Sequence, residues 1–160
     1  MAETKMSVVA LLAHLAKAAD LKASELSSGS VNRTQGTKHW KYGYGGYAYG
    51  GPVDCSGLIV AIARYLRPNY LRMTSADMEA LCEYNISDKL PDKVGALVWR
   101  PKTATQSGHV GIYTGKSAAG DMYTVEAFDE TDNVARRGNR LAPTAAKPFT
   151  KWGYLDFVQY

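Results

Sequence analysis

Residues 52–68 read PVDCSGLIVAIARYLRP. From Leu58 to Leu66 the run is nearly all apolar, its arginines fall in the last turns, and a proline ends it. This pattern predicts a mostly buried helix whose carboxyl-terminal end places cations against the negative end of the helix dipole. Asp54 is a typical N-cap residue, so Cys55 falls in the first turn of the helix.

The position of Cys55 has two interpretations. Free backbone N–H groups and the positive end of the helix dipole stabilise a thiolate there and can lower the thiol pKa below about 8.5. The carboxylate of Asp54 opposes a thiolate, so a reactive cysteine needs an additional cation, and a histidine is the obvious donor. From placement alone, a nucleophile and a buried inert thiol both stay open.

Upstream of this helix, the sequence predicts a first helix and then a loop. Four apolar residues share the spacing i, i+3, i+4, i+7 of an amphipathic helix: Val8, Leu11, Leu12 and Leu15. His14 and Lys17 interrupt the apolar stretch, which argues against a secretion signal. Residues 22–51 show no sustained period and end in YGYGGYAYGG, so we expect a loop that either packs over the core or lines a substrate cleft.

Downstream, the pattern changes from helical to strand-like. A third helix is predicted from Thr74 or Ser75, with Met78, Leu81 and Cys82 on its core face. Beyond residue 91, strand-like runs occupy residues 95–99, 109–114, 122–128 and 154–158. Helices first and strands later indicate an α+β fold with an antiparallel sheet, and the lack of a linker predicts one domain over residues 1–160.

Composition narrows the class of protein. The chain is 46% hydrophobic and 11% aromatic, which excludes disorder, and it has no run of about 18 apolar residues that could span a membrane. The net charge of +4 is mild and only Arg136, Arg137 and Arg140 cluster, so nucleic-acid binding is not expected. Cys55 and Cys82 are spaced for neither a disulfide framework nor a zinc site.

His109 is the histidine best placed to partner Cys55. His14 falls in the predicted first helix and His39 in the loop, whereas His109 opens a strand with Gly111 on the same face. The missing side chain of Gly111 leaves room for the Cys55 helix to pack on that face. A cysteine at a helix start and a histidine on a facing strand are the parts of a thiol protease pair.

Several short motifs together resemble the NlpC/P60 family over about residues 38–128. They are the run from Tyr42 to Gly46, Asp54-Cys55-Ser56-Gly57, Arg72 with Thr74 and Ser75, residues 95–98, and residues 108–113. The resemblance implies a papain-like α+β fold with N-terminal helices packed on a central antiparallel sheet. It also implies hydrolysis of bacterial peptidoglycan stem peptides, typically between D-glutamate and the diamino acid, without metal or cofactor.

The same resemblance implies roles for single residues. Cys55 takes the place of the nucleophile and His109 that of the general base. Tyr44 takes the place of an active-site tyrosine, which could help to hold the oxyanion, and Asp54 and Ser56 those of residues that face the substrate.

The family's third catalytic position falls on Glu126, where His, Asn or Gln is usual. A carboxylate there would hold the tautomer of His109 and favour imidazolium. A solvent-facing strand carboxylate is the alternative interpretation of Glu126, and Asp129 is a weaker substitute for the role. The glycine-containing segment 116–120 predicts a hairpin, in a register that places Glu126 opposite His109 and Thr124 opposite Gly111. A register shifted by one residue would send Glu126 to the other face and leave His109 without a polar partner.

The cellular role follows only as an expectation. Without a signal peptide or a wall-binding repeat, the chain resembles a phage lysin that accumulates in the host cytoplasm before release to the wall. An antibacterial toxin amidase delivered to target bacteria, an amidase or acyltransferase for lipids or small amides, and a non-catalytic wall-binding protein are the alternatives. The oligomeric state stays open.

Overall fold

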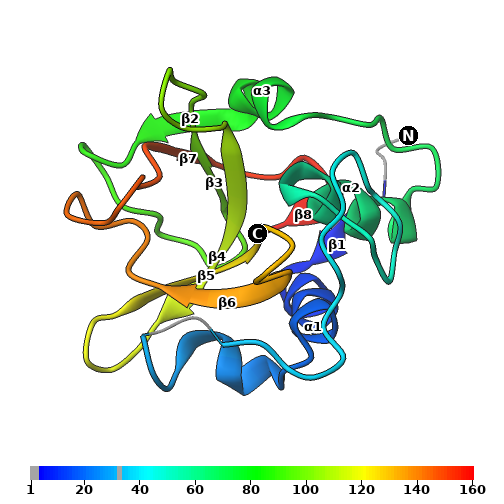
Figure 1. Cartoon of the computed structure of the whole chain (residues 1–160), viewed down its shortest axis with the longest axis horizontal. Helices are drawn as coiled ribbons and strands as arrows, with labels where there is room; N and C mark the ends of the chain where they lie inside the picture. The colour runs from blue at the N-terminus through cyan, green and yellow to red at the C-terminus, as the bar shows by residue number, and fades with distance from the viewer. Residues whose placement is uncertain (1–3, 32–33) are drawn as a thin grey trace.

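A computed structural model of the chain describes residues 4–31 and 34–160, and Figure 1 shows the elements. The helices are α1 (Val8–Ala19), α2 (Cys55–Leu66) and α3 (Ser75–Met78), with 3-10 turns at Ala23–Ser27 and Glu79–Leu81. The strands are β1 (Met6–Ser7), β2 (Cys82–Asn85), β3 (Leu97–Arg100), β4 (His109–Lys116), β5 (Met122–Ala127), β6 (Val134–Gly138), β7 (Lys151–Gly153) and β8 (Val158–Gln159). Residues 1–3, before the predicted first helix, and residues 32–33, within the predicted loop, lie outside the described ranges.

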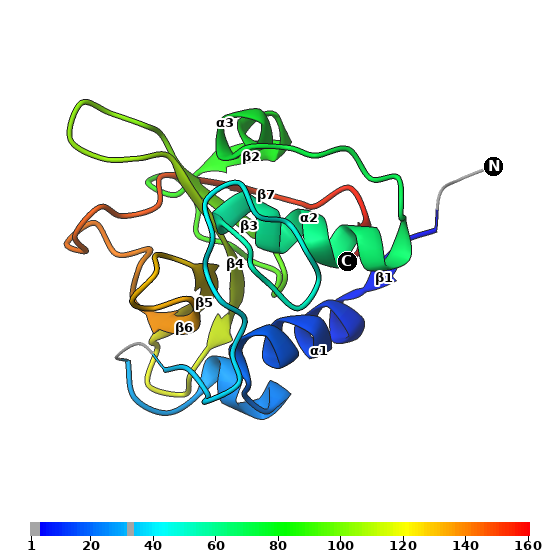
Figure 2. The ribbon, with the colours of Figure 1, turned by 45° about the vertical axis from the view of Figure 1, so that its right-hand side comes forward.

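Six of the strands form one sheet in the order β2-β7-β3-β4-β5-β6, and every neighbouring pair in it is antiparallel. β1 and β8 form a separate parallel pair. Helices α1 and α2 lie side by side against one face of the large sheet (Figure 2). The predicted α+β fold with helices packed on a central antiparallel sheet is confirmed.

The two long helices form for the reasons that the sequence indicates. In α1, the side chain of Ser7 accepts a hydrogen bond from the Ala10 N–H, and Asp20 ends the helix in the left-handed conformation. In α2, Asp54 is the N-cap, as predicted, and its carboxylate accepts a hydrogen bond of 2.7 Å from the Gly57 N–H. Residues 56–63 of α2 are all buried, which confirms the predicted buried helix.

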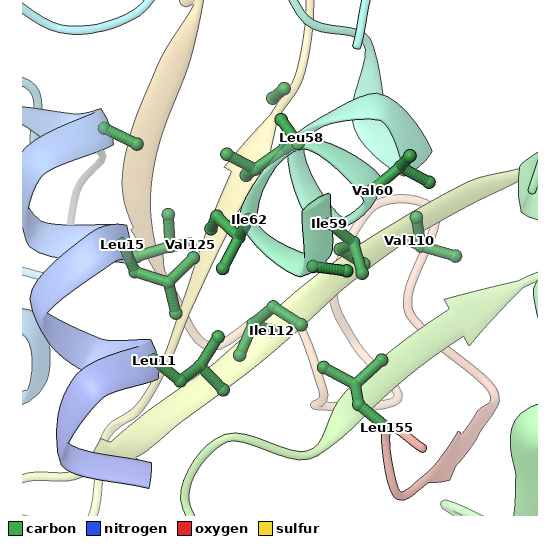
Figure 3. Packing of buried hydrophobic residues seen from close by; sticks show 14 of the residues in the cluster. Leu11, Leu15, Leu58, Ile59, Val60, Ile62, Val110, Ile112, Val125 and Leu155 are labelled. Atoms are coloured by element: carbon green, nitrogen blue, oxygen red, sulfur yellow. The ribbon is translucent and has the colours of Figure 1, made fainter. Parts of the chain in front are cut away.

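The main core lies between the two helices and the sheet, where apolar side chains from all three interdigitate (Figure 3). The labelled members are Leu11, Leu15, Leu58, Ile59, Val60, Ile62, Val110, Ile112, Val125 and Leu155. Burying one such side chain contributes about 1.5–3 kcal/mol. A second cluster, around Trp152, Tyr113 and Phe149, covers the opposite face of the sheet.

Some predicted elements are wrong in type or extent. The third helix spans only Ser75–Met78, and Cys82 begins β2, where it is half-buried rather than on the core face of a helix. The strand predicted at 154–158 is turn and loop except at its end, where β8 begins at Val158. Pairing with β7 overrides the helical preference of the run that begins at Cys82, whereas residues 154–157 form a loop and a turn before β8.

The strand β6 was not expected, because only two apolar residues precede its arginines. It forms the edge of the sheet through antiparallel pairing with β5, with Glu126 paired to Ala135 and Thr124 to Arg137. Pairing with a partner that is distant in sequence leaves no period-2 pattern in a segment of this composition.

The β4–β5 hairpin exists, but its register differs by two residues from the expected one. Tyr113, and not Gly111, pairs with Thr124, and a bulge follows before Gly115. On the His109 side of the bulge the difference is two residues, so the side chains there, including Glu126, keep their predicted face.

The prediction that α2 packs on the Gly111 face of β4 is wrong. α2 packs on the other face, against Val110 and Ile112 (Figure 3). The space at Gly111 instead accommodates Glu126, because a Cβ at residue 111 would lie 2.7 Å from Cγ of Glu126 and 3.3 Å from Cζ of Phe149.

Candidate active site

Cys55 is the first residue of α2, and its half-buried side chain lies against the start of β4. Burial raises the pKa of the Cys55 thiol above its ordinary value, and the charge of Asp54 adds to that rise. Backbone N–H groups of Val110, Ser56 and Cys55 itself act in the opposite direction. The predicted stabilisation by N–H groups is present, but desolvation outweighs it, so the resting group is a neutral thiol.

Asp54 and Ser56 are nearly buried and belong to one network with Arg72. The Asp54 carboxylate accepts two hydrogen bonds of 3.1 Å from Arg72 and one of 3.0 Å from the Gly45 N–H. Arg72 also donates to Oγ of Ser56 at 3.0 Å. This network connects the tyrosine-rich loop and the chain after α2 to Asp54, the residue that caps α2. A direct contact of Asp54 or Ser56 with substrate stays a prediction.

Tyr42 is the loop tyrosine whose charge interacts with that of Cys55. Burial raises the pKa of Tyr42, and the next contribution in size comes from the charge of Cys55. Tyr44, which the motif suggested, is 94% exposed. Tyr42 and Tyr49 pack against the main core, so the loop fits the packing interpretation at these two positions.

His109 begins β4 and is buried, with 4% of the residue exposed. Its Nε2 lies 2.7 Å from Oε1 of Glu126. Phe128 meets the imidazole edge-on at 5.5 Å and Phe149 stacks on it at 5.6 Å between ring centres. Burial lowers the pKa of His109 below its ordinary value, although Glu126 opposes that shift.

Glu126 is fully buried, which contradicts the interpretation of a solvent-facing strand carboxylate. Besides His109, its carboxylate accepts hydrogen bonds from Thr124 Oγ1 at 2.5 Å and from Arg140 at 3.2 and 3.1 Å. Burial alone would raise the pKa of Glu126, but the hydrogen bonds and charges of His109 and Arg140 outweigh it and lower the pKa well below its usual range. Glu126 is therefore ionised.

The remaining candidates lie in other surroundings. Asp129 caps its own turn, because its carboxylate accepts the N–H groups of Thr131 and Asp132 at 2.9 and 2.7 Å. His14 hydrogen-bonds Tyr49 at 2.7 Å, and His39 lies against Gly36 and Asn133. Among residues 4–31 and 34–160, no group of three His, Cys, Asp or Glu side chains is arranged to hold a metal ion.

Two arginines of the site were missed as site residues. Arg100, on β3, pairs with His109 across the sheet, and its charge interacts with those of Glu126 and Cys55. Arg140 follows β6 and donates to Glu126. The cluster of arginines at residues 136–140 was visible in the sequence, but nothing in its spacing indicates which of them points inward.

Chemically, the site combines a thiol at a helix start, against the beginning of β4, with a buried imidazole at the first residue of β4 whose Nε2 is held by a carboxylate. Such a set can transfer a proton from sulfur to imidazole and expose a nucleophile to backbone N–H donors. Within the described ranges, no helix has the length and apolar character needed to cross a bilayer.

Comparison with known proteins gives the family of the chain. No curated protein matches the chain. A family model described as NlpC/P60 family matches residues 39–134, a range that contains Cys55, His109 and Glu126 and ends before Arg140. Since this match covers more than half of the sequence, the chain belongs to the NlpC/P60 family.

Proposed function

We propose that the protein is a cysteine peptidase that hydrolyses amide bonds in the stem peptides of bacterial peptidoglycan. Membership of the NlpC/P60 family indicates hydrolase or peptidase activity directed at peptidoglycan. The observation that carries the mechanism is the buried 2.7 Å hydrogen bond between His109 Nε2 and Glu126 Oε1. Because Nε2 is engaged there, we assign the catalytic proton transfer to Nδ1 of the same ring.

The proposed first half-reaction forms an acyl-enzyme. His109 Nδ1 takes the proton from Cys55, and the sulfur forms a bond to the amide carbonyl carbon. The resulting oxyanion accepts hydrogen bonds from backbone N–H groups at the start of α2, and we place Tyr42 beside it rather than Tyr44. The C–N bond then breaks, and the leaving amine takes the proton from Nδ1.

The second half-reaction restores the enzyme. Nδ1 takes a proton from water, and the hydroxide adds to the thioester carbonyl. The C–S bond then breaks, and the proton returns from His109 to Cys55, so that one amide and one water become one acid and one amine. We also propose that the described residues act as one catalytic domain, with Asp54 and Ser56 beside the bound peptide.

The test of this function is digestion of purified peptidoglycan followed by mass spectrometry of the released fragments. We expect new D-glutamyl carboxyl groups and new free amines on the diamino acid, with the glycan chains intact. Binding to peptidoglycan without new termini would favour a non-catalytic wall-binding protein, and glycan fragments would contradict a peptidase. A lysin role would additionally require that expression in a bacterium, with a membrane lesion supplied, causes lysis.

We expect a bell-shaped dependence of kcat/KM on pH, set by the neutral Cys55 thiol and the neutral His109 imidazole. The active form is a neutral imidazole with a protonated thiol. The acid limb therefore reports protonation of His109, whose pKa lies below the ordinary 6.5 because of burial. The alkaline limb reports loss of the proton from Cys55, whose pKa burial raises above 9.0.

This assignment reverses the one expected for a thiolate and imidazolium pair, in which Cys55 would set the acid limb. The measurement is kcat/KM against pH, with circular dichroism at each pH. The control is needed because the lowered pKa values of His109 and Glu126 also make the folded state less stable as the pH falls. An alkaline limb near neutral pH would contradict the neutral pair.

A further inference from the structure

We propose that Arg140 is a positioning residue that balances the charge of Glu126, so that this carboxylate can orient His109 through Nε2–H without favouring a second proton on Nδ1. The proposal rests on the Cys55–His109 mechanism above. It concerns a residue outside the range 39–134 that the family model matches.

Arg140 holds the carboxylate at two points. Its Nε donates to Oε2 of Glu126 at 3.2 Å and its terminal nitrogen donates to Oε1 at 3.1 Å. The planar guanidinium matches both carboxylate oxygens and so restricts rotation of the carboxyl group. Because Oε1 is also the atom bonded to His109 Nε2 at 2.7 Å, the same contact fixes the direction of the imidazole.

The same two aromatic rings enclose the cation and the imidazole. The Arg140 guanidinium lies 5.3 Å from the ring centre of Phe128 and 5.5 Å from that of Phe149, which are the rings that flank His109. The Arg140 side chain is only 11% exposed. Charge interactions in such surroundings are stronger than in water, so an unbalanced charge would have a large effect on the imidazole.

The negative charge beside His109 must be balanced because the residue that orients the imidazole, Glu126, is a carboxylate. A lone carboxylate 2.7 Å from an imidazole favours imidazolium, which cannot accept the proton of Cys55. The charged groups that act on His109 are Glu126 on β5, Arg140 after β6 and Arg100 on β3. The Cys55 thiol on α2 lies against the backbone of Val110, the next residue of β4. Both arginines oppose protonation of His109, but only Arg140 hydrogen-bonds the carboxylate.

The test compares Arg140→Gln, Glu126→Gln and the double variant by the acid limb of kcat/KM and by ¹⁵N NMR titration of His109. We expect Arg140→Gln to raise the pKa of His109, and with it the acid limb, by roughly one unit. Glu126→Gln should move both readouts to lower pH. The double variant removes one charge of each sign, so both readouts should return close to the wild-type position.

Two further variants separate charge from geometry. Arg140→Lys keeps the cation but not the two-point contact, so the acid limb should stay in place while kcat falls. Arg137→Gln removes a neighbouring cation that also lies over Phe128 but pairs with Asp132 at 3.9 Å, so the limb should not move.

Failure of the proposal and failure of the proposed function give different results. If Arg140→Gln lowers kcat/KM equally at every pH, leaves the His109 titration unchanged, or is not corrected in the double variant, Arg140 has only a structural role. If wild-type protein does not hydrolyse peptidoglycan, the proposed function fails, while the NMR titration still decides the role of Arg140.

Discussion

Cys55→Ala and Cys55→Ser are each expected to lose at least about 1,000-fold in kcat/KM on peptidoglycan while the protein stays folded. The sulfur is the only atom of the proposed site that bonds to the substrate, and neither a methyl group nor a hydroxyl with an ordinary alcohol pKa replaces it. Release of stem-peptide fragments measures the loss, and thermal unfolding measures the fold.

Cys82→Ala is the matched control for this prediction. Cys82 is the other cysteine of the chain, and burial raises its pKa to about 12. It begins β2, on the strand next to β7, and its thiol lies 3.9 Å from the Met78 carbonyl oxygen. Activity should stay within about twofold of wild type, because no proposed step uses this thiol. If both Cys55 variants still released stem-peptide fragments at the wild-type rate, Cys55 would be rejected as the nucleophile.

Glu126→Ala is expected to destabilise the fold by about 3–5 kcal/mol, because it leaves Arg140 as an uncompensated buried charge. It also removes the acceptor of His109 Nε2, so activity per folded molecule should fall. Glu126→Gln keeps an oxygen acceptor and a similar volume, so its losses in stability and activity should both be smaller. Denaturant unfolding gives the stability, and kcat/KM is compared where each variant is fully folded.

Glu79→Ala provides the control for removal of a carboxylate. Glu79 pairs with Lys151 at 3.2 Å, but 49% and 39% of the two side chains are exposed. Exposed pairs contribute less than about 1 kcal/mol, so this variant should unfold almost as the wild type does. If Glu126→Ala were equally mild and as active as Glu126→Gln, the buried carboxylate would have no orienting role.

Elements that depend on local pattern could be predicted from residue order. The unbroken apolar run after Asp54 is long enough to predict α2, its N-cap and the placement of Cys55, and the spacing of apolar residues predicts α1. Alternation within β4 also placed His109 and Gly111 on one face of that strand, since a strand has a period of two residues. These features depend on neighbours in sequence, and so residue order alone suffices.

Features that depend on residues distant in sequence could be seen only in the folded chain. The hairpin register, the edge strand β6 and the contact between Gly111 and Glu126 arise from pairing between strands, which local preference does not encode. The direction of the Arg140 side chain depends on the chain after β6. The pKa of Cys55 depends on how much protein covers it: a helix start favours the thiolate, but the depth of burial, which only the folded chain has, raises the pKa.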